Sequence, residues 1–148
     1  MAANSRFAIA IHTLGLLAFV GDKPVSSKMI AESVDTNAVV IRRIMRKFVK
    51  HGLVAVRMGT GGGSSLIKSP EEISLADIYN SLEEDALFQV PELGNEHPCS
   101  MGRVVRPVLE GIFGGVEGEM KVRLEEISLK DVMVLVSRGL SEDICTKE

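Results

Sequence analysis

The chain has 148 residues, 45% of them hydrophobic and 25% charged, which fits one globular domain, or one domain with a dimerising appendage, and excludes a disordered or collagen-like chain. Its two cysteines are too few for a disulfide framework. Because tryptophan is absent and there is one tyrosine, aromatic stacking is disfavoured as the basis of a binding site, and with it single-stranded nucleic acid as the main partner.

The formal net charge of −3 hides an uneven distribution of charge along the chain. Residues 1–70 carry a balance of +7, and residues 71–148 carry a balance of −10. Between Thr36 and Pro70 the cations face no acidic residue. This asymmetry predicts a half that binds a polyanion and an acidic half with another task. On charge alone, a solvated helix face explains the cations equally well.

The first predicted element is a helix over an apolar run from Phe7 to Val20. The run lacks the cleavage site of a signal peptide and is too short to cross a bilayer, so we expect a cytoplasmic protein with no membrane partner. We interpret His12 as a packed core residue rather than a ligand. The main buried face of this helix would hold Phe7, Ile11, Leu14 and Ala18.

Two short helices separated by a tight turn are predicted next. Ser26 or Ser27 caps the first helix, which extends to Val34, and the second extends over residues 37–50. Asp35 occupies the turn, where glycine is more usual but aspartate is tolerated. The arrangement predicts a helix-turn-helix.

The second helix of this pair has two distinct faces. The apolar face holds Ile41, Ile44, Met45 and Phe48. The opposite face holds Val39, Arg42, Arg43, Arg46 and Lys50. A basic stripe on a helix whose back is anchored favours insertion into the major groove of DNA, where arginine can donate two hydrogen bonds to guanine.

A β-hairpin is predicted over about residues 53–68, with a glycine-rich turn at residues 59–63. Behind a helix-turn-helix such a hairpin is typical of a wing that approaches the DNA backbone or minor groove. A loop that cradles a nucleotide phosphate is disfavoured, because neither a P-loop ending nor a following helix is present. The candidate DNA-binding residues are Ser27, Lys28, Asn37, Val39, Arg42, Arg43, Arg46, Lys50, Arg57, Thr60, Gly61 and Lys68.

The acidic half is predicted to be helical. Ser74 caps a helix through about residue 84, and residues 85–99 form a loop. A long helix then extends over residues 100–126, in which Pro107 predicts a kink or a later start. A last short helix, capped by Ser128, ends at residue 139.

The predicted fold class is mainly α with a small β-hairpin. We expect residues 1–84 to form a winged helix-turn-helix domain that binds double-stranded DNA. Residues 100–148 are expected to form a helical region that pairs two copies of the chain. The candidate dimerisation residues are Val105, Leu109, Ile112 and Val116.

Several motifs resemble those of one known family. They are Ala10 through Ala18, Ile30-Ala31, Ile44 through Val54, the wing pattern Gly59-x-x-Gly62-Gly63-x-x-Leu66, and residues 73–83. On these motifs the chain resembles the Rrf2 family of bacterial winged-helix transcription regulators, which includes the iron–sulfur cluster regulator and the nitric-oxide-sensing repressor. The resemblance implies a homodimer, paired through the long C-terminal helix, that binds a partly palindromic operator, and we expect a repressor.

The chain departs from the family at three places. Met58 stands where the family has an arginine before the first wing glycine, and Ser64 replaces an aromatic residue. Cluster-binding relatives have three cysteines between the helix after the wing and the dimer helix, where this chain has Cys99 alone. We therefore expect a branch with no iron–sulfur cluster, no bound metal and no cofactor.

Two questions stay open at the level of sequence. Cys99, with His97 nearby, is either an incidental cysteine or the sensor of a redox or small-molecule effector, and the loop over residues 85–99 could roof a ligand pocket. No nucleophile elbow, HExxH or metal-ligand spacing is present, so an enzyme is not expected. A winged-helix adaptor that binds proteins is the alternative, but it would have no need of the basic stripe.

Overall fold

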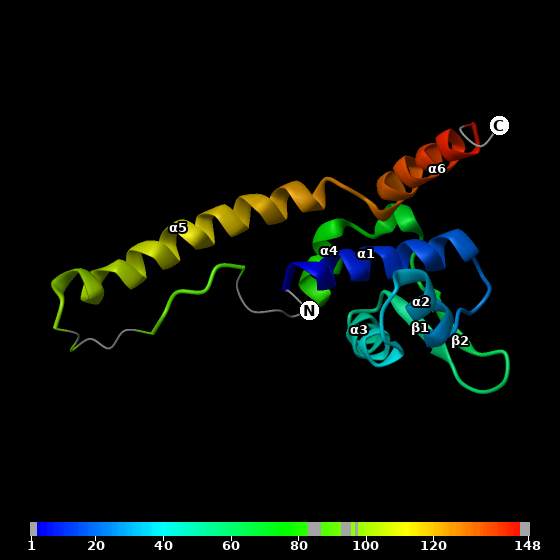
Figure 1. Cartoon of the computed structure of the whole chain (residues 1–148), viewed down its shortest axis with the longest axis horizontal. Coiled ribbons are helices and arrows are strands. Elements are labelled where there is room, and N and C mark those ends of the chain that lie inside the picture. Colours follow the sequence, from blue (N-terminus) through cyan, green and yellow to red (C-terminus); the bar gives the residue numbers. More distant parts are fainter. Residues whose placement is uncertain (1–2, 83–86, 93–95, 97, 146–148) are drawn as a thin grey trace.

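The computed structural model describes residues 3–82, 87–92, 96 and 98–145. Within them the order of elements is α1 (Ala3–Val20), α2 (Ser27–Val34), α3 (Ala38–Lys50), β1 (Val54–Arg57), β2 (Gly63–Leu66), a 3₁₀ turn η1 (Pro70–Glu72), α4 (Leu75–Ser81), α5 (Ser100–Glu125) and α6 (Leu129–Cys145). The mainly helical class with one hairpin is confirmed. Figure 1 shows α2, α3 and the hairpin on one side of α1, α6 on the opposite side, and α5 extending away to the left.

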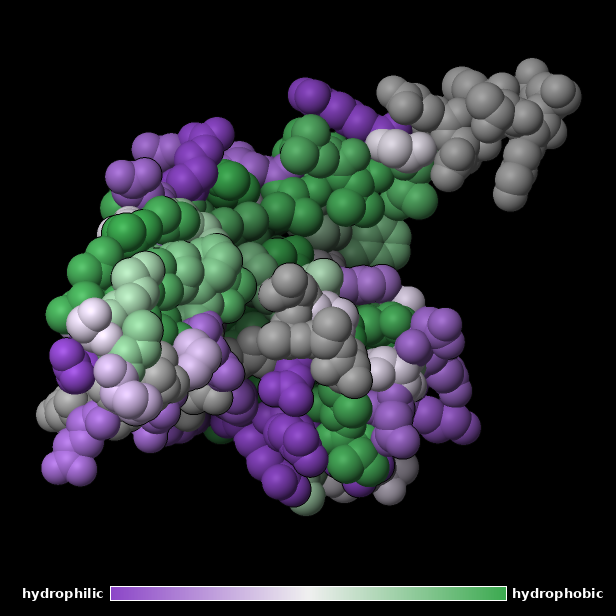
Figure 2. All heavy atoms as spheres, turned by 60° about the vertical axis from the view of Figure 1, so that its left-hand side comes forward, coloured by the Kyte–Doolittle hydropathy of each residue, from purple (hydrophilic) through white to green (hydrophobic). Residues whose placement is uncertain are grey.

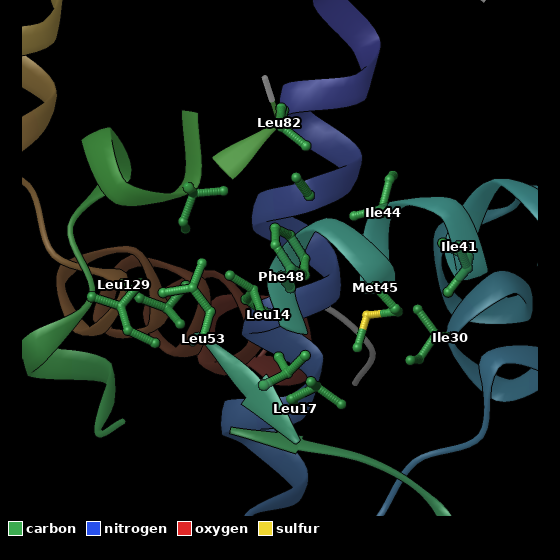
Figure 3. Packing of buried hydrophobic residues seen from close by; sticks show 14 of the residues in the cluster. Leu14, Leu17, Ile30, Ile41, Ile44, Met45, Phe48, Leu53, Leu82 and Leu129 are labelled. Carbon is green, nitrogen blue, oxygen red and sulfur yellow. The ribbon is translucent and has the colours of Figure 1, made fainter. Parts of the chain in front are cut away.

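The core lies around α1 and joins every part of the winged-helix half to the first turn of α6. Leu14 of α1, Phe48 of α3 and Leu53 are buried together with Leu129 of α6. Figure 3 shows Leu14 and Phe48 in the middle of this cluster, with Leu129 on one side and Ile30 on the other. Apolar burial on this scale is the main favourable contribution to folding.

The buried face of α1 differs from the predicted one. Ala10, Thr13, Leu14 and Leu17 are buried, whereas the other predicted members of the face are only half-buried. His12 is exposed, so its interpretation as a core residue is wrong. The side chain lies on the far side of the helix from Leu14, two residues and about 200° away, and its Nε2 is 3.2 Å from Ser33 Oγ.

The predicted helix-turn-helix is confirmed in its local detail. Ser26 caps α2 by accepting a hydrogen bond from the backbone N–H of Met29 at 3.2 Å. Asp35 takes a left-handed conformation with φ of 55°, the role that glycine usually fills in such turns. Asn37 then caps α3 through its Oδ1, which accepts from the N–H of Val39 at 2.7 Å.

The C-terminal helices differ from their predicted bounds. The helix capped by Ser74 ends at Ser81, and residues 83–86 lie outside the described residues. α5 begins at Ser100 and continues through Pro107 without a later start. α6 continues past Gly139 to Cys145, so the predicted end at that glycine is wrong. A glycine lowers helix propensity by about 1 kcal/mol but keeps the backbone hydrogen bonds, so it need not end a helix.

The junction between α5 and α6 is fixed to the winged-helix half. The N–H of Leu75 donates to Ile127 O and the N–H of Leu129 donates to Ile73 O, both at 2.8 Å. Lys130 Nζ lies 2.6 Å from Glu71 Oε1, and this hydrogen bond lowers the pKa of the Glu71 carboxyl. The pair is therefore present at neutral pH and is lost in acid, when Glu71 takes up a proton. Among the described residues, no helix is long and apolar enough to cross a membrane.

Candidate nucleic-acid interface

The apolar face of α3 fixes the direction in which its cations point. Ile41, Ile44, Met45 and Phe48 are each at most 5% exposed and belong to the core. The opposite side of the helix is therefore held outward, as predicted. Its exposed side chains are Val39, Arg42, Arg43, Arg46 and Lys50.

The hairpin is attached to the segment that leads into α2. β1 and β2 pair antiparallel from Val54↔Leu66 to Arg57↔Gly63. The N–H of Val25 donates to Ser64 O at 2.9 Å, and the N–H of Ser64 donates to Val25 O at 2.8 Å. These two bonds hold the wing at a fixed place beside the helix-turn-helix.

The glycines of the hairpin are required by its geometry. Gly63 has φ of 152°, and a Cβ on it would lie 2.6 Å from the carbonyl atoms of Val25. A Cβ on Gly62 would lie 2.2 Å from Arg57 O. The element after the hairpin is the three-residue turn η1, not a helix that could bind a phosphate at its N-terminus. The glycine-rich segment is thus a hairpin turn, and the phosphate-loop alternative has no support.

The remaining candidates lie on the helix pair, on the hairpin and just after it, and Figure 1 shows the helix pair and the hairpin below α1. Arg57, Thr60, Gly61 and Lys68 of the wing are exposed. On the helix pair, Lys28 and Asn37 are also exposed, whereas Ser27 is half-buried. The structure therefore leaves the predicted cations of α2, α3 and the hairpin exposed, and Ser27 is the candidate least open to a ligand.

A long part of α5 lies away from the rest of the chain (Figure 1). Within Ser100–Glu125, all of which the structure describes, Gly102 is the one buried residue. Of the four candidate dimerisation residues, Ile112 and Val116 are exposed, whereas Val105 and Leu109 are half-buried. Figure 2 shows a broad hydrophobic area over the upper part of the face in view.

An exposed seam of small and apolar residues follows α5. Its members recur at alternating intervals of four and three residues, the spacing of a helix that packs along a second helix. Building a Cβ on any glycine of the seam meets no atom within 4 Å, so these glycines serve no contact within the single chain. The seam consists of Val104, Val108, Gly111, Gly115, Gly118 and Val122.

Comparison with known proteins places the chain in a family. A model of Rrf2, described as an iron-dependent transcriptional regulator, matches residues 3–134. The chain belongs to the Rrf2 family. YwnA of Bacillus subtilis, named as an HTH-type transcriptional regulator, is 40% identical over 132 residues, which are 88% of this chain and 96% of YwnA.

Two further relatives are also described as DNA-binding or transcription-regulating proteins. The HTH-type transcriptional repressor NsrR of Streptomyces coelicolor is 25% identical over 117 residues, which are 74% of this chain and 78% of NsrR. A crystal structure described as that of a DNA binding protein is 36% identical, with a TM-score of 0.68 over 86% of this chain and 98% of that one. This Rrf2 protein is therefore a transcription regulator and not an enzyme.

The donor residues of this Rrf2 chain do not fit an iron–sulfur cluster. Such clusters are held mainly by cysteine thiolates, and the chain has two cysteines, Cys99 and Cys145, far apart in sequence. Among the described residues, no group of three His, Cys, Asp or Glu side chains could hold a metal ion. Cys99 is exposed just before α5, and His97 lies outside the described residues.

A hollow of about 410 Å³ lies between residues 88–90 and α5. The rings of Phe88 and Phe113 meet there with their centroids 4.9 Å apart, and Arg106 and Glu117 line the same hollow. This is the place where the sequence allowed a ligand pocket under the loop. Cys99 is not among the described lining residues, so the structure keeps the cysteine and the hollow as separate features.

Sequence analysis did not single out Lys47, which differs from the other cations of α3 in its contacts. It lies in the cation-rich helix α3 but is half-buried, and its Nζ donates a hydrogen bond to Leu82 O at the end of α4. A cation at a helix C-terminus also interacts favourably with the helix dipole. Lys47 therefore joins α3 to the end of α4 and helps to hold the orientation of α3.

Lys47→Met should lower affinity for operator DNA about tenfold while leaving the salt dependence of binding unchanged. The change removes a hydrogen bond from a charged donor within the protein and no contact with a phosphate. Arg46→Met, at the exposed neighbouring position, is the matched control and should make the salt dependence shallower. Titrations at several salt concentrations would measure both. Equal reductions in slope would place Lys47 on the DNA instead.

Proposed function

We propose that this Rrf2 protein is a repressor that binds a palindromic operator as a homodimer and needs no cofactor. The observation that carries the proposal is the outward cationic side of α3, because its apolar side is fixed in the core and the cations cannot turn inward together. A helix held in this way fits the major groove of B-DNA. Arg42 and Arg43, nearer to its N-terminus, are the candidates for base edges.

The wing supports the same orientation. Its attachment to Val25 holds the hairpin, and with it Arg57, beside the helix pair, where Arg57 is placed to reach the phosphates that flank the groove. Phosphate contacts supply affinity and fix the position of the protein, whereas base contacts supply specificity. The base contacts are thus assigned to α3 and the phosphate contacts to the wing.

The exposed seam on α5 supports a homodimer in which two copies of this helix pair. One helix-turn-helix reads few base pairs, and two copies related by a two-fold axis would place their recognition helices about 34 Å apart, one turn of DNA. The seam on α5 gives the two copies a surface on which glycines permit a close approach. Figure 1 shows α5 extending to the left of the helix-turn-helix, so pairing through α5 would leave α3 open to DNA.

Repression is supported by the name of NsrR, a transcriptional repressor. An effector would act through the segment around Cys99, either by oxidation of that exposed cysteine or by a small molecule in the hollow beside Phe88. The segment follows α4, whose last carbonyl accepts the hydrogen bond of Lys47.

The proposal is tested by the salt dependence of binding to duplexes selected from a random pool. Six to eight neutralised phosphates per dimer give a slope of about −5 to −7 for log affinity against log salt. Selection with and without a reductant would show whether Cys99 changes the preference. A flat response between low and physiological salt would remove DNA as the ligand.

A further inference from the structure

A single apolar side chain lies in the middle of the cationic side of α3. Val39 is 55% exposed. At 100° per residue, Arg46 and Lys50 lie within about 20° of it around the helix axis, and Arg42 and Arg43 lie within about 60°. Whatever surface these cations approach, Val39 approaches it too.

The side chain of Val39 is held in one place. Its backbone N–H donates to Asn37 Oδ1 at 2.7 Å, which fixes the first turn of α3. The next two residues anchor that turn, since Val40 is half-buried and Ile41 is fully buried. A β-branched valine in a helix keeps one strongly preferred rotamer, so its two methyl groups point in a defined direction.

The chemistry of the major groove offers valine one partner. Valine can neither donate nor accept a hydrogen bond, so phosphates and the polar base edges give it no favourable contact. The apolar group that unmodified B-DNA presents in the major groove is the C5-methyl of thymine. Recognition helices contact base edges with their N-terminal residues, and Val39 is the second residue of α3.

We propose that Val39 reads the C5-methyl group of one thymine in each half-site of the operator. The inference rests on the proposed function. It adds which base, and which group of that base, the side chain of Val39 contacts. Exposed single apolar residues are common on protein surfaces. If Val39 is such a residue, its contribution to affinity is the same for every duplex sequence. If Val39 contacts a thymine methyl group, in contrast, the affinity for DNA depends on the presence of thymine at one position.

The same helix provides a matched control. Val49 is 46% exposed and lies ten residues later, about 15 Å along the axis towards the C-terminal end. It has the same side chain, but it lies away from the turn that enters the groove. Val49→Ala should therefore leave the response to thymine methyl groups unchanged.

The test replaces each thymine of a selected operator by deoxyuridine, which removes the methyl group and keeps every hydrogen-bonding edge. Wild-type protein should lose about fourfold in affinity per half-site at one position, the effect of about 0.8 kcal/mol for one methyl group. Val39→Ala should bind the thymine and deoxyuridine duplexes equally, whereas Val49→Ala should keep the wild-type loss. Circular dichroism of both variants checks that α3 is intact, and Val39→Ser repeats the test with a second side chain.

The outcomes separate this inference from the function on which it rests. A wild-type protein that binds its operator but has no deoxyuridine-sensitive position would overturn the reading of a thymine methyl. So would a sensitivity that persists in Val39→Ala. Failure of the wild-type chain to select any duplex would instead refute the proposed function.

Discussion

Ile112→Asp should give a folded monomer that has lost about 10²–10⁴-fold in affinity for a two-half-site operator. Ile112 is 55% exposed and lies beside the glycines of the α5 seam. In a homodimer the substitution would bury two carboxylates of like charge in an apolar interface, at a cost of several kcal/mol. A monomer loses the effective concentration that the first bound half-site provides for the second. Sedimentation velocity and operator titration would measure the two effects.

The control for this change is Met29→Asp, which places the same charge on an equally exposed apolar residue of α2. It should stay dimeric in sedimentation, because α2 lies away from α5 (Figure 1). Ile112→Val should keep both the dimer and the affinity. If Ile112→Asp remained dimeric with normal operator binding, the interface would lie elsewhere and the exposed seam would need another explanation.

The helix-turn-helix was predictable because its signals are local. Ser26 and Asn37 cap their helices with neighbouring backbone groups, and Asp35 turns the chain within four residues. The two faces of α3 follow from helical periodicity alone, since a 13-residue helix with well-separated apolar and charged residues has one way to face a core.

The orientation of individual side chains depended on contacts distant in sequence. Lys47 has the same charge as Arg46 but lies about 100° further round α3, on the flank of its buried face, where Leu82 O accepts its hydrogen bond. On α5 several lines of residues satisfy a spacing of three or four, so periodicity could not choose among them. The hydrogen bond from Tyr79 of α4 to Glu117, at 3.2 Å, and the ring contact of Phe88 with Phe113 show which side of α5 faces its own chain. Those contacts leave Leu109 half-buried and Val108 exposed.

Arg42→Ala and Arg43→Ala should each weaken operator binding by about 1–3 kcal/mol and relax the preference at particular base pairs. Both side chains are exposed in the first half of α3, where a guanidinium can donate two hydrogen bonds to a guanine. Lys68→Ala, beyond the wing, should weaken all sequences alike and make the salt slope shallower. Repeating the selection from random duplexes with each variant would compare preference and affinity together.

Both arginine variants and the lysine variant remove one cation, so a difference in preference reports the position of the cation and not the loss of charge. Identical behaviour of the two classes would mean that α3 does not enter the groove by its N-terminal half, and the assignment of Val39 to a thymine would fall with it.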